Sequence, residues 1–511
     1  MEVPSVDYAA VLPMLIVFGV ACIGVLVEAF APKATRWGIQ VTISLVAILA
    51  AGVSLILYAT GASATKAGTT TFSGSISVDR PSLFLWGTLL LLGLGAVFLI
   101  ADRKVEPGGA FVAQAAIRPG TVQDRAQAAT TSQTEVFPLT LFALGGMMTF
   151  CAANDLLTMF IALEVLSLPL YLMCGLARRR RLISQEAAVK YFLLGAFSSA
   201  FFLYGLALLY GYADSVKLVD IAHAAAGSDR SDTLLFAGLG LLVVGLLFKG
   251  SVGPFHTWTP DVYQGAPTPV TGFMAACTKV AAFGAILRVL SVGFSSTSWE
   301  WRGVMWAVAI ISMALGAVLG LTQTDVKRMI AYSSVAHAGF LLVGAIAMTE
   351  DGLSGTLFYL LAYGFTTLAA FGVVSLVRDS SGEATHLSAW AGLAKRSPLL
   401  AGVFTFLLLA LAGIPLTSGF VGKFVVFSAA LSDGMAPLVV VALVFSAVAA
   451  FFYLRVIVLM YFSEPAADGP TVTVPGGFTT AAIALGVVVT LVLGVLPAFA
   501  LDWAGAGGFA S

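Results

Sequence analysis

The stretch FKGSVGPFHTWTPDVYQGAPTP, residues 248–269, interrupts a long apolar segment, and the rest of the chain is organised around it. Gly253 and Pro254 predict a break in the helix, because proline lacks a backbone donor and glycine adds conformational freedom. Lys249 precedes this break and His256 follows it. In lipid, freed backbone groups need partners, so such a break must be buried in protein or line water. A charge and an imidazole at a break of this kind indicate an ion path.

The composition indicates a membrane protein. Of 511 residues, 59% are hydrophobic and only 10% are charged. Many apolar runs reach about eighteen residues or more, the length that crosses a bilayer as a helix. We therefore predict an all-α polytopic membrane protein. The formal net charge of +0 gives no indication of a nucleic-acid partner.

The cysteines do not indicate a metal or redox centre. They lie in apolar segments with no short spacing between them: Cys22, Cys151, Cys174 and Cys277. Iron–sulfur, zinc and haem sites require such spacings, and the sequence also lacks the motifs typical of nicotinamide and flavin sites. We predict that the cysteines are small buried side chains and that this chain holds no cofactor.

Hydrophobic runs predict about fourteen transmembrane helices, two of them broken. The first is expected to be a retained helix rather than a cleaved signal, because Glu2 and Asp7 precede it in place of basic residues. The predicted spans lie near 9–30, 37–58, 82–101, 136–153, 156–176, 186–210, 233–266 (broken), 269–292, 303–321, 326–347, 353–377, 399–431 (broken), 436–462 and 478–501.

Basic residues are concentrated in alternate loops, and the run Arg178–Arg181 is the strongest signal. Because cytoplasmic loops carry the excess of Lys and Arg, we predict that this side is cytoplasmic and that both termini lie outside the cell (inner or plasma) membrane. The longest polar connection, 102–134, is then a cytoplasmic loop, with or without an interfacial helix. The predicted cytoplasmic set is Lys33, Arg36, Arg103, Lys104, Arg118, Arg125, Arg178–Arg181, Lys327, Arg328, Arg378, Lys395 and Arg396, against Lys66, Arg80, Lys217, Arg230 and Arg302 outside.

The chain contains a faint internal repeat. NDLLTMFIALEVLS at 154–167 resembles TDVKRMIAYSSVAH at 324–337, and FSS at 197–199 matches FTT at 365–367. The break at Pro254 matches a second one, AGIPLTSGFVGKF, at 412–424. An odd number of spans separates equivalent helices, which predicts two inverted five-helix repeats, each with a broken helix, as in secondary transporters.

This repeat predicts the division of the chain. A three-helix region with its cytoplasmic loop comes first, then the two repeats, then a linker and a last helix. The predicted ranges are 1–135, 136–292, 303–462 and 463–511.

Four charged residues are predicted at mid-depth in the bilayer, where each costs on the order of 3 kcal/mol by insertion scales. Glu164 lies ~13 Å into a ~30 Å core and is too short to reach the surface. Lys249 and Lys279 are central in their spans, and Lys423 follows the second break. Structural ion pairs are one explanation, but three lysines exceed one deep carboxylate. We favour a proton relay, which needs groups that change charge at small cost.

Four further polar side chains are candidates for this relay or for its support. Lys190 lies near the cytoplasmic end of its span, where it can snorkel or carry protons. His256 and His337 are either relay groups or satisfied core histidines, and His337 lies in the helix that mirrors the Glu164 helix. Asp261 lies near the cytoplasmic end and is expected to cap or brace its loop.

Three stretches resemble one known family, and the resemblance extends over nearly the whole chain. They are FKGSVGPFHTWTPDVYQGAPTPVTGFMAACTKVAAFG (248–284), LTQTDVKRMIAYSSVAHAGF (321–340) and LAGIPLTSGFVGKFVVF (411–427). The family is that of the antiporter-like membrane subunits of respiratory complex I. Within it the chain is similar to the N-type subunits, because Lys423 stands where M-type subunits carry a glutamate and the long lateral helix of L-type subunits is missing.

The resemblance implies a proton-translocating subunit of NADH:quinone oxidoreductase. It implies that Glu164 pairs with Lys249, that Lys279 and Lys423 continue the path, and that His256 and His337 lie on the same hydrophilic axis. NADH, FMN, iron–sulfur clusters and quinone would then belong to partner subunits, with K- and M-type subunits as neighbours. Two alternatives remain open, a subunit of a stand-alone cation/proton antiporter and a scaffold whose charges are structural.

Overall fold

The computed structural model describes residues 6–61, 68–106, 108–112, 121–123, 133–227, 231–379, 382–465 and 469–510. Most of the 102–134 connection, with the interfacial helix considered for it, lies outside these ranges. Four basic residues that contribute to the orientation prediction also lie outside the described residues: Lys66, Arg118, Arg125 and Arg230.

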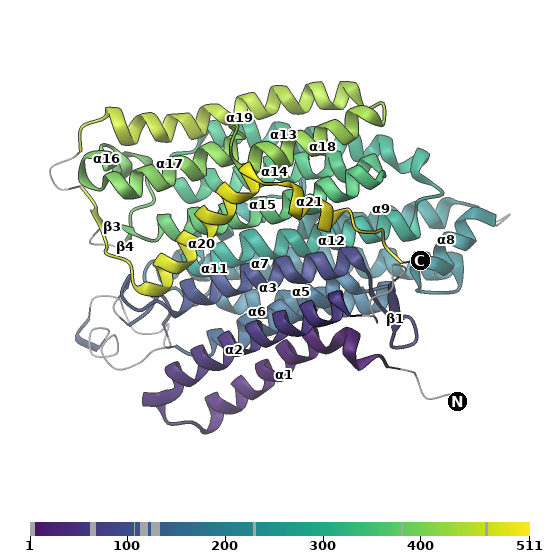
Figure 1. Ribbon diagram of the computed structural model, residues 1–511, viewed down its shortest axis with the longest axis horizontal. Helices are drawn as coiled ribbons and strands as arrows, with labels where there is room; N and C mark the ends of the chain where they lie inside the picture. The colour runs from purple at the N-terminus through teal and green to yellow at the C-terminus, as the bar shows by residue number, and fades with distance from the viewer. Residues whose placement is uncertain are drawn as a thin grey trace.

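The chain forms a bundle of helices that run side by side along the long axis of the molecule, with loops and short strands at the two ends (Figure 1). Within the described residues, eleven helices are long and apolar enough to cross a membrane. Each coincides with a predicted span to within a few residues. They are α1 (Tyr8–Phe30), α2 (Lys33–Thr60), α3 (Arg80–Ala101), α6 (Leu156–Cys174), α7 (Arg181–Ala213), the segment Thr268–Gly293, α13 (Ser298–Thr322), α14 (Val326–Ala347), α15 (Glu350–Val374), α19 (Ala436–Phe462) and α20 (Gly477–Val495).

The other three predicted spans are built from shorter apolar helices. The first is α5 (Val136–Ala152). The predicted span 233–266 consists of α9 (Thr233–Lys249) and α10 (Trp258–Gly265), and the span 399–431 consists of α17 (Pro398–Ala412) and α18 (Ser418–Ser432). Both helices are therefore broken where glycine and proline predicted a break.

Side chains of neighbouring helices bind backbone groups that the first break frees. The amide of Gly253 donates a hydrogen bond to Ser312 Oγ at 3.0 Å, and Trp258 Nε1 donates to the carbonyl oxygen of Phe248 at 3.0 Å. At the second break Gly413 has a φ of +87°, the left-handed conformation that glycine favours at the end of a helix. The backbone groups of the first break thus find partners within the protein, as the bilayer requires, whereas Ile414 and Leu416 at the second break are exposed.

The segment Thr268–Gly293 is not a uniform α-helix. It consists of α11 (Thr268–Phe273), a π-helical turn η1 (Met274–Thr278), α12 (Lys279–Arg288) and a second π-helical turn η2 (Val289–Gly293). Such turns are frequent at functional sites, because they shift the face on which the following side chains lie. Lys279 is the first residue after η1.

Several short elements were not predicted. Two antiparallel ribbons lie at the ends of the bundle, β1 (Thr69–Thr71) with β2 (Ile76–Val78), and β3 (Val377–Asp379) with β4 (Gly382–Glu383) and β5 (Thr471–Val472). The loops also contain α8 (Leu218–Gly227), η3 (Leu387–Trp390) and α16 (Leu393–Arg396). The last predicted span stops at Val495, before Pro497, and α21 (Ala498–Ala504) follows.

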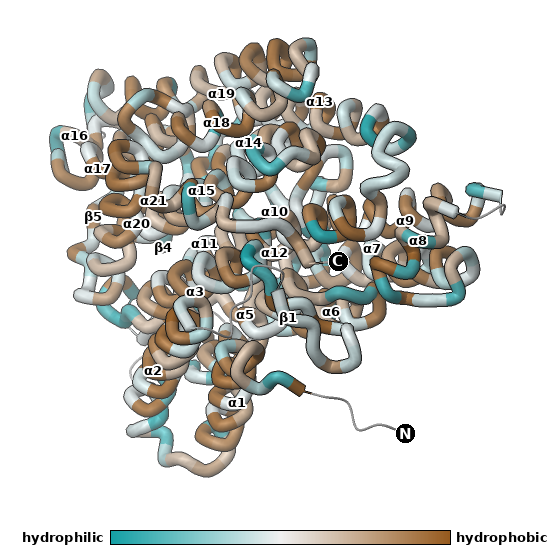
Figure 2. The backbone as a smooth tube through the Cα atoms, turned by 45° about the vertical axis from the view of Figure 1, so that its right-hand side comes forward, coloured by the Kyte–Doolittle hydropathy of each residue, from teal (hydrophilic) through white to brown (hydrophobic). Residues whose placement is uncertain are grey.

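The three helical segments at the centre of the bundle are almost completely enclosed by other helices. Thr268–Gly293, α14 and α15 have nearly all of their residues buried, whereas α1, α2 and α19 are mostly exposed. Figure 2 shows hydrophobic residues along these outer helices. The enclosed segments are also the least hydrophobic of the candidate spans. The polar candidates Lys279 and His337 belong to this enclosed centre.

Two matching backbone contacts relate the halves of the chain. Asp155 pairs with Lys217 in an isolated antiparallel bridge, and Asp325 pairs with His386 in another. Each aspartate also caps its helix, with its side chain accepting a hydrogen bond from the backbone amide three residues later. The first bridge leads into α8 and the second into η3, and α8 and the β3–β4 ribbon lie at opposite ends of the bundle (Figure 1).

The two ends of the described chain lie at the same end of the molecule (Figure 1). The amide of Asp7 donates a hydrogen bond to Thr71 Oγ1 in β1 at 3.0 Å, and the amide of Ala510 donates to Asp79 Oδ2 at 3.0 Å. Both ends therefore lie on the same side of the bundle.

Candidate functional site

Lys249, the last residue of α9, points into the bundle and is 2% exposed. Its Nζ donates hydrogen bonds to Ser167 Oγ at 2.7 Å and to the hydroxyl of Tyr191 at 3.1 Å. It also lies over the rings of Tyr171 and Tyr191, 5.7 and 5.1 Å from their centroids. The ammonium is thus held by hydroxyl groups and aromatic rings.

The expected ion pair between Glu164 and Lys249 is not formed in this structure. Among the residues that the structure describes, Glu164 has no ion-pair partner, and its Oε1 is buried without a hydrogen bond. The carboxylate is still near enough for its charge to act on Lys249. Ser167, which binds Lys249, follows Glu164 by three residues and so lies on the same face of α6. The lysine is therefore bound about one helical turn from the carboxylate.

Lys279 reaches across to both halves of the bundle and is also 2% exposed. Its Nζ donates to the carbonyl oxygen of Gly250, at the first break, at 3.2 Å, and to the carbonyl oxygen of Ser334 in α14 at 2.7 Å. The ring of Tyr363 lies beside it, with its centroid 5.5 Å from Nζ. Lys279 thus connects the residue that follows Lys249 with the helix that carries His337.

Lys423 binds the end of the helix at the second break, as Lys279 does at the first. Its Nζ donates to the carbonyl oxygens of Leu411 and Ala412 at 3.2 and 2.9 Å, and to Ser446 Oγ at 3.0 Å. A Cβ on Gly413 would lie 3.0 Å from the stem of Lys423, a tight contact, and the φ of +87° also favours glycine here. The end of α17 therefore forms a binding site for the ammonium, and the negative pole of the helix favours the cation there.

His337 is held on both sides by tyrosine hydroxyls. Its Nδ1 lies 2.7 Å from the hydroxyl of Tyr359, and its Nε2 lies 3.3 Å from the hydroxyl of Tyr453. Tyr453 also bonds to Ser333. On α14, Ser334 three residues before His337 binds Lys279, and the ring of Phe340 three residues after it lies 5.0 Å from Lys423 Nζ. His337 is therefore flanked on its helix by contacts of both lysines.

His256 and Lys190 lie apart from these contacts. His256 is 5% exposed, its ring packs edge-on against Tyr332 with centroids 6.1 Å apart, and its Nδ1 has no hydrogen-bond partner among the described residues. Lys190 Nζ lies 2.7 Å from Glu186 and 2.6 Å from Asp261. Lys190 thus belongs to an ion cluster near the first residues of α7 rather than to the enclosed centre.

Asp261 braces its segment, as predicted, but it lies in α10 rather than in a loop. Besides Lys190, the guanidinium of Arg328 binds it, with Nη1 2.6 Å from Oδ1. The cluster joins α7, α10 and α14.

Sequence reasoning missed a buried ion pair that the structure does contain, between Arg288 and Asp79. Both side chains are completely buried, with Arg288 Nη2 2.9 Å from the carboxylate. Arg288 also donates to Ser82 Oγ and to the carbonyl oxygen of Cys151. The pair was not predicted because Asp79 precedes its helix and Arg288 is near the end of its own, where a charge usually reaches water.

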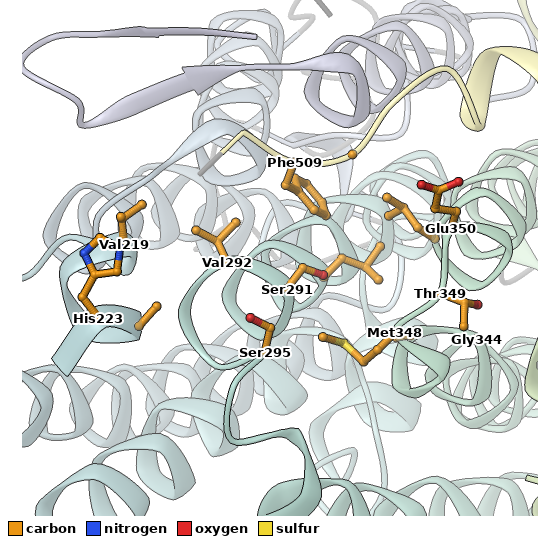
Figure 3. Close-up of a pocket in the computed structure, with 15 residues that line it drawn as sticks. Val219, His223, Ser291, Val292, Ser295, Gly344, Met348, Thr349, Glu350 and Phe509 are labelled. Atoms are coloured by element: carbon orange, nitrogen blue, oxygen red, sulfur yellow. The ribbon is translucent and has the colours of Figure 1, made fainter. Parts of the chain in front are cut away.

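An open pocket lies beside this pair, on the side of the chain ends. Its volume is about 390 Å³, and Figure 3 shows His223 and Glu350 at its opposite ends with Phe509 between them. The ring of Phe509 also covers the guanidinium of Arg288, at 4.7 Å. None of the predicted relay residues lines this pocket.

The enclosed centre combines lysines, an imidazole and hydroxyl groups. Within the described part of the chain, no group of three or more His, Cys, Asp or Glu residues is placed to hold a metal ion. Three buried hydroxyls near Lys279 and His337 have no hydrogen-bond partner there: Ser334, Tyr363 and Thr367. Such groups bind water when the site has room, and bound water conducts protons between side chains.

Comparison with known proteins gives concordant matches. The family model described as NADH:quinone oxidoreductase/Mrp antiporter, TM, matches residues 153–464. NADH-quinone oxidoreductase subunit N of Saccharopolyspora erythraea is 76% identical, over 100% of this chain and 99% of that protein. The same subunit of Acidothermus cellulolyticus is 59% identical, over 98% of this chain and 96% of that protein.

Solved structures match over almost the whole length. A chain of respiratory complex I from Thermus thermophilus with bound aureothin has a TM-score of 0.77 and 34% identity, covering 97% of this chain and 100% of that one. A chain of the Mrp complex from Dietzia sp. has a TM-score of 0.82 at 21% identity, covering 98% of this chain and 97% of that one, and shows a shared fold.

Proposed function

This chain belongs to the NADH-quinone oxidoreductase subunit N family, the antiporter-like membrane subunits of respiratory complex I, and we propose a specific path for the protons that it moves. It is a multi-pass, proton-pumping membrane subunit of complex I and works together with the other subunits of that enzyme. Membership in the subunit N family favours complex I over the stand-alone antiporter and over an inert scaffold.

The proposed path begins at Glu164 and Lys249. Ser167 holds the Lys249 ammonium at 2.7 Å, one turn away from Glu164, so a rotation of the lysine side chain can exchange one partner for the other. An opposite charge nearby favours the charged form of each group. We infer that the pair forms and breaks during turnover, and that its opening releases a proton from Lys249.

Lys279, His337 and Lys423 continue the path. Lys279 binds the carbonyl oxygen of Gly250, next to Lys249, and that of Ser334, one turn before His337. His337 follows Ser334 by one turn and precedes Phe340, whose ring lies 5.0 Å from Lys423 Nζ, by another. Both of its ring nitrogens bind hydroxyls. The contacts around Lys279 are the observation that carries the proposal, because one titratable group joins the first broken helix to α14, the helix that carries His337.

Two features are proposed for the ends of the path. His256, beside the first break, and Lys190, in the ion cluster with Asp261, are proposed to connect Lys249 with the cytoplasm. Each half of the chain would provide one half-channel, and the axis of lysines would join them.

We further propose the inverted repeat, the orientation and the neighbours. The matching bridges at Asp155 and Asp325 support two inverted five-helix repeats, 136–292 and 303–462. These repeats would be part of fourteen spans, with the region 1–135 before them in the sequence and 463–511 after them. The basic loops support both termini on the outer side of the cell membrane. K- and M-type subunits are the proposed neighbours, and NADH, FMN, iron–sulfur clusters and quinone are assigned to partner subunits, with no cofactor in this chain.

Replacement of Lys279 tests the path. In membrane vesicles that contain the whole complex, Lys279→Ala should assemble but pump protons roughly tenfold more slowly, because the link between the halves is lost. Lys395→Ala is the matched control, since Lys395 is exposed and pairs with Glu464 at the surface. Wild-type proton flux in an assembled Lys279→Ala complex contradicts the proposal and favours a structural role for the lysines.

A further inference from the structure

Two completely buried tyrosines have equivalent places in the two halves of the chain. Tyr191 lies in α7 and Tyr359 in α15, and both are 0% exposed. They are 168 residues apart, the same spacing that separates Phe197 from Phe365 in the matching FSS and FTT stretches. The repeat therefore places one tyrosine in each half, six residues before the matched phenylalanine.

Each tyrosine contacts a residue of the proposed path. The hydroxyl of Tyr191 lies 3.1 Å from Lys249 Nζ, and the hydroxyl of Tyr359 lies 2.7 Å from His337 Nδ1. The ring of Tyr359 also packs against Gly422, next to Lys423, where an added Cβ would lie 2.6 Å from the ring. In both halves, then, a phenol from the equivalent helix binds a group that can change charge.

The repeat also relates one partner of Lys249 to His337 itself. Ser167, which binds Lys249, and His337 are 170 residues apart, the spacing that separates Asp155 from Asp325. In each half, therefore, the tyrosine and the residue at the Ser167 or His337 position lie on equivalent helices, α6 with α7 and α14 with α15. Lys249 reaches the first of these pairs from α9.

The chemistry of the phenol distinguishes it from the other partners. Ser167 donates its own proton to the carbonyl oxygen of Leu163, so its oxygen can only accept a hydrogen bond from Lys249. A tyrosine hydroxyl both donates and accepts. The tyrosine oxygen accepts a hydrogen bond from an ammonium or from an imidazole N–H. After the nitrogen has lost its proton, the hydroxyl rotates and donates its own hydrogen to the lone pair of that nitrogen.

We propose that Tyr191 and Tyr359 are positioning residues of the proton relay, each holding its partner in place before and after that partner loses a proton. The proton leaves Lys249 Nζ towards Lys279, or leaves the His337 ring towards Lys423, while the phenol keeps its own proton and only reverses its hydrogen bond. A buried amine or imidazole without such a partner would be left unsatisfied in one of its two states, which slows transfer. This inference rests on the path proposed above.

Removal of the hydroxyls tests the inference. In vesicles with the complete complex, Tyr191→Phe and Tyr359→Phe should assemble normally and pump protons roughly tenfold more slowly, the effect of losing one hydrogen bond to a charged group. Tyr212→Phe is the control on the same helix α7, because Tyr212 is 1% exposed and its hydroxyl donates to the carbonyl oxygen of Ala224, away from the path. Wild-type flux in both assembled phenylalanine variants overturns the inference.

A second measurement separates positioning from simple packing. Incorporation of 3-fluorotyrosine at position 191 keeps the ring and the hydroxyl but makes the hydroxyl more acidic, so the pH profile of proton pumping should shift. An unchanged profile overturns the inference even if Tyr191→Phe fails to assemble. Lys249→Ala is measured alongside: loss of pumping there with normal pumping in Tyr191→Phe defeats only the tyrosine inference, whereas normal pumping in Lys249→Ala defeats the underlying path.

Discussion

Lys279 donates a hydrogen bond to the carbonyl oxygen of Gly250, 3.2 Å away, across the break between α9 and α10. The last carbonyls of a helix lack intrahelical partners and carry partial negative charge, so a cation is favoured there. Lys423 binds Leu411 and Ala412 at the second break in the same way. The breaks and the central lysines are therefore parts of one arrangement, in which each broken helix end holds an ammonium.

Lys249→Arg should assemble and yet pump poorly, more like Lys249→Ala than like the native protein. The guanidinium keeps the positive charge near Glu164, but its pKa above ~12 prevents proton release. Proton flux is measured in reconstituted vesicles, with Lys395→Arg as the control at an exposed salt bridge. Native flux through the Lys249→Arg complex means that Lys249 supplies only a fixed charge.

Glu164→Ala should insert and assemble, because it removes a buried carboxylate that has no ion-pair partner among the described residues. Quinone reduction coupled to pumping should fall roughly tenfold or more, since Lys249 loses the group that holds its proton. Glu300→Ala, at an exposed position in the first turn of α13, serves as the control. Full turnover and pumping in the assembled Glu164→Ala complex argue for a purely structural carboxylate.

Asp79→Asn should lower the amount of assembled complex, because it leaves the buried guanidinium of Arg288 without its counter-charge. Breaking a buried pair in this way costs about 3–5 kcal/mol. Arg288→Met added to Asp79→Asn should restore much of the loss, since both charges are then gone. Glu464→Gln, which breaks an exposed pair with Lys395, should cost less than about 1 kcal/mol. The prediction fails if Asp79→Asn assembles as well as Glu464→Gln.

Asp261→Asn should destabilise the complex, because Lys190 and Arg328 lose the carboxylate that joins α7, α10 and α14. The pairs are partly exposed, so each should contribute about 1 kcal/mol or less. Thermal denaturation of the solubilised complex should show a lower midpoint for Asp261→Asn than for the native protein. An unchanged midpoint contradicts this bracing role.

Cysteine labelling tests the orientation. Cys22 is exposed, so the prediction that all four cysteines are buried was wrong for this one, and it is first replaced by serine. A cysteine at Asp214, which is exposed in the turn after α7, should then react with an impermeant reagent from outside. A cysteine at Leu182, which is 81% exposed and follows Arg181, should react only after the membrane is opened. Labelling of position 182 in intact cells inverts the proposed topology.

Much of the fold was predictable because periodicity and helix breakers act locally. The predicted 326–347 and 436–462 coincide with α14 and α19, and glycine and proline located both broken helices. The short ribbons escaped prediction because each contains only two or three paired residues, and pairs such as Val377 with Val472 depend on distant segments meeting.

The sequence allowed the charged residues of the site to be predicted, but not the groups that bind them. A lysine in the middle of an apolar span is conspicuous, so Lys249, Lys279 and Lys423 were found. Backbone carbonyls bind two of them, and no sequence signal reports a carbonyl. Tyr191 and Tyr359 did have a signal, their common spacing with FSS and FTT, but a tyrosine in a membrane helix attracts little notice because it is also common in cores and at interfaces.

The enclosure of the central helices has a consequence for how the protein is made. Thr268–Gly293, α14 and α15 are the least hydrophobic of the candidate spans and are almost wholly surrounded by other helices. A lysine such as Lys279 at mid-helix opposes entry into lipid by on the order of 3 kcal/mol. These segments therefore depend on earlier helices of the same chain, already in the bilayer, to receive them during synthesis. Outer helices such as α1, α2 and α19 are apolar enough to enter the bilayer without such help. The helices most deeply buried in the bundle are therefore the ones that insert least readily by themselves.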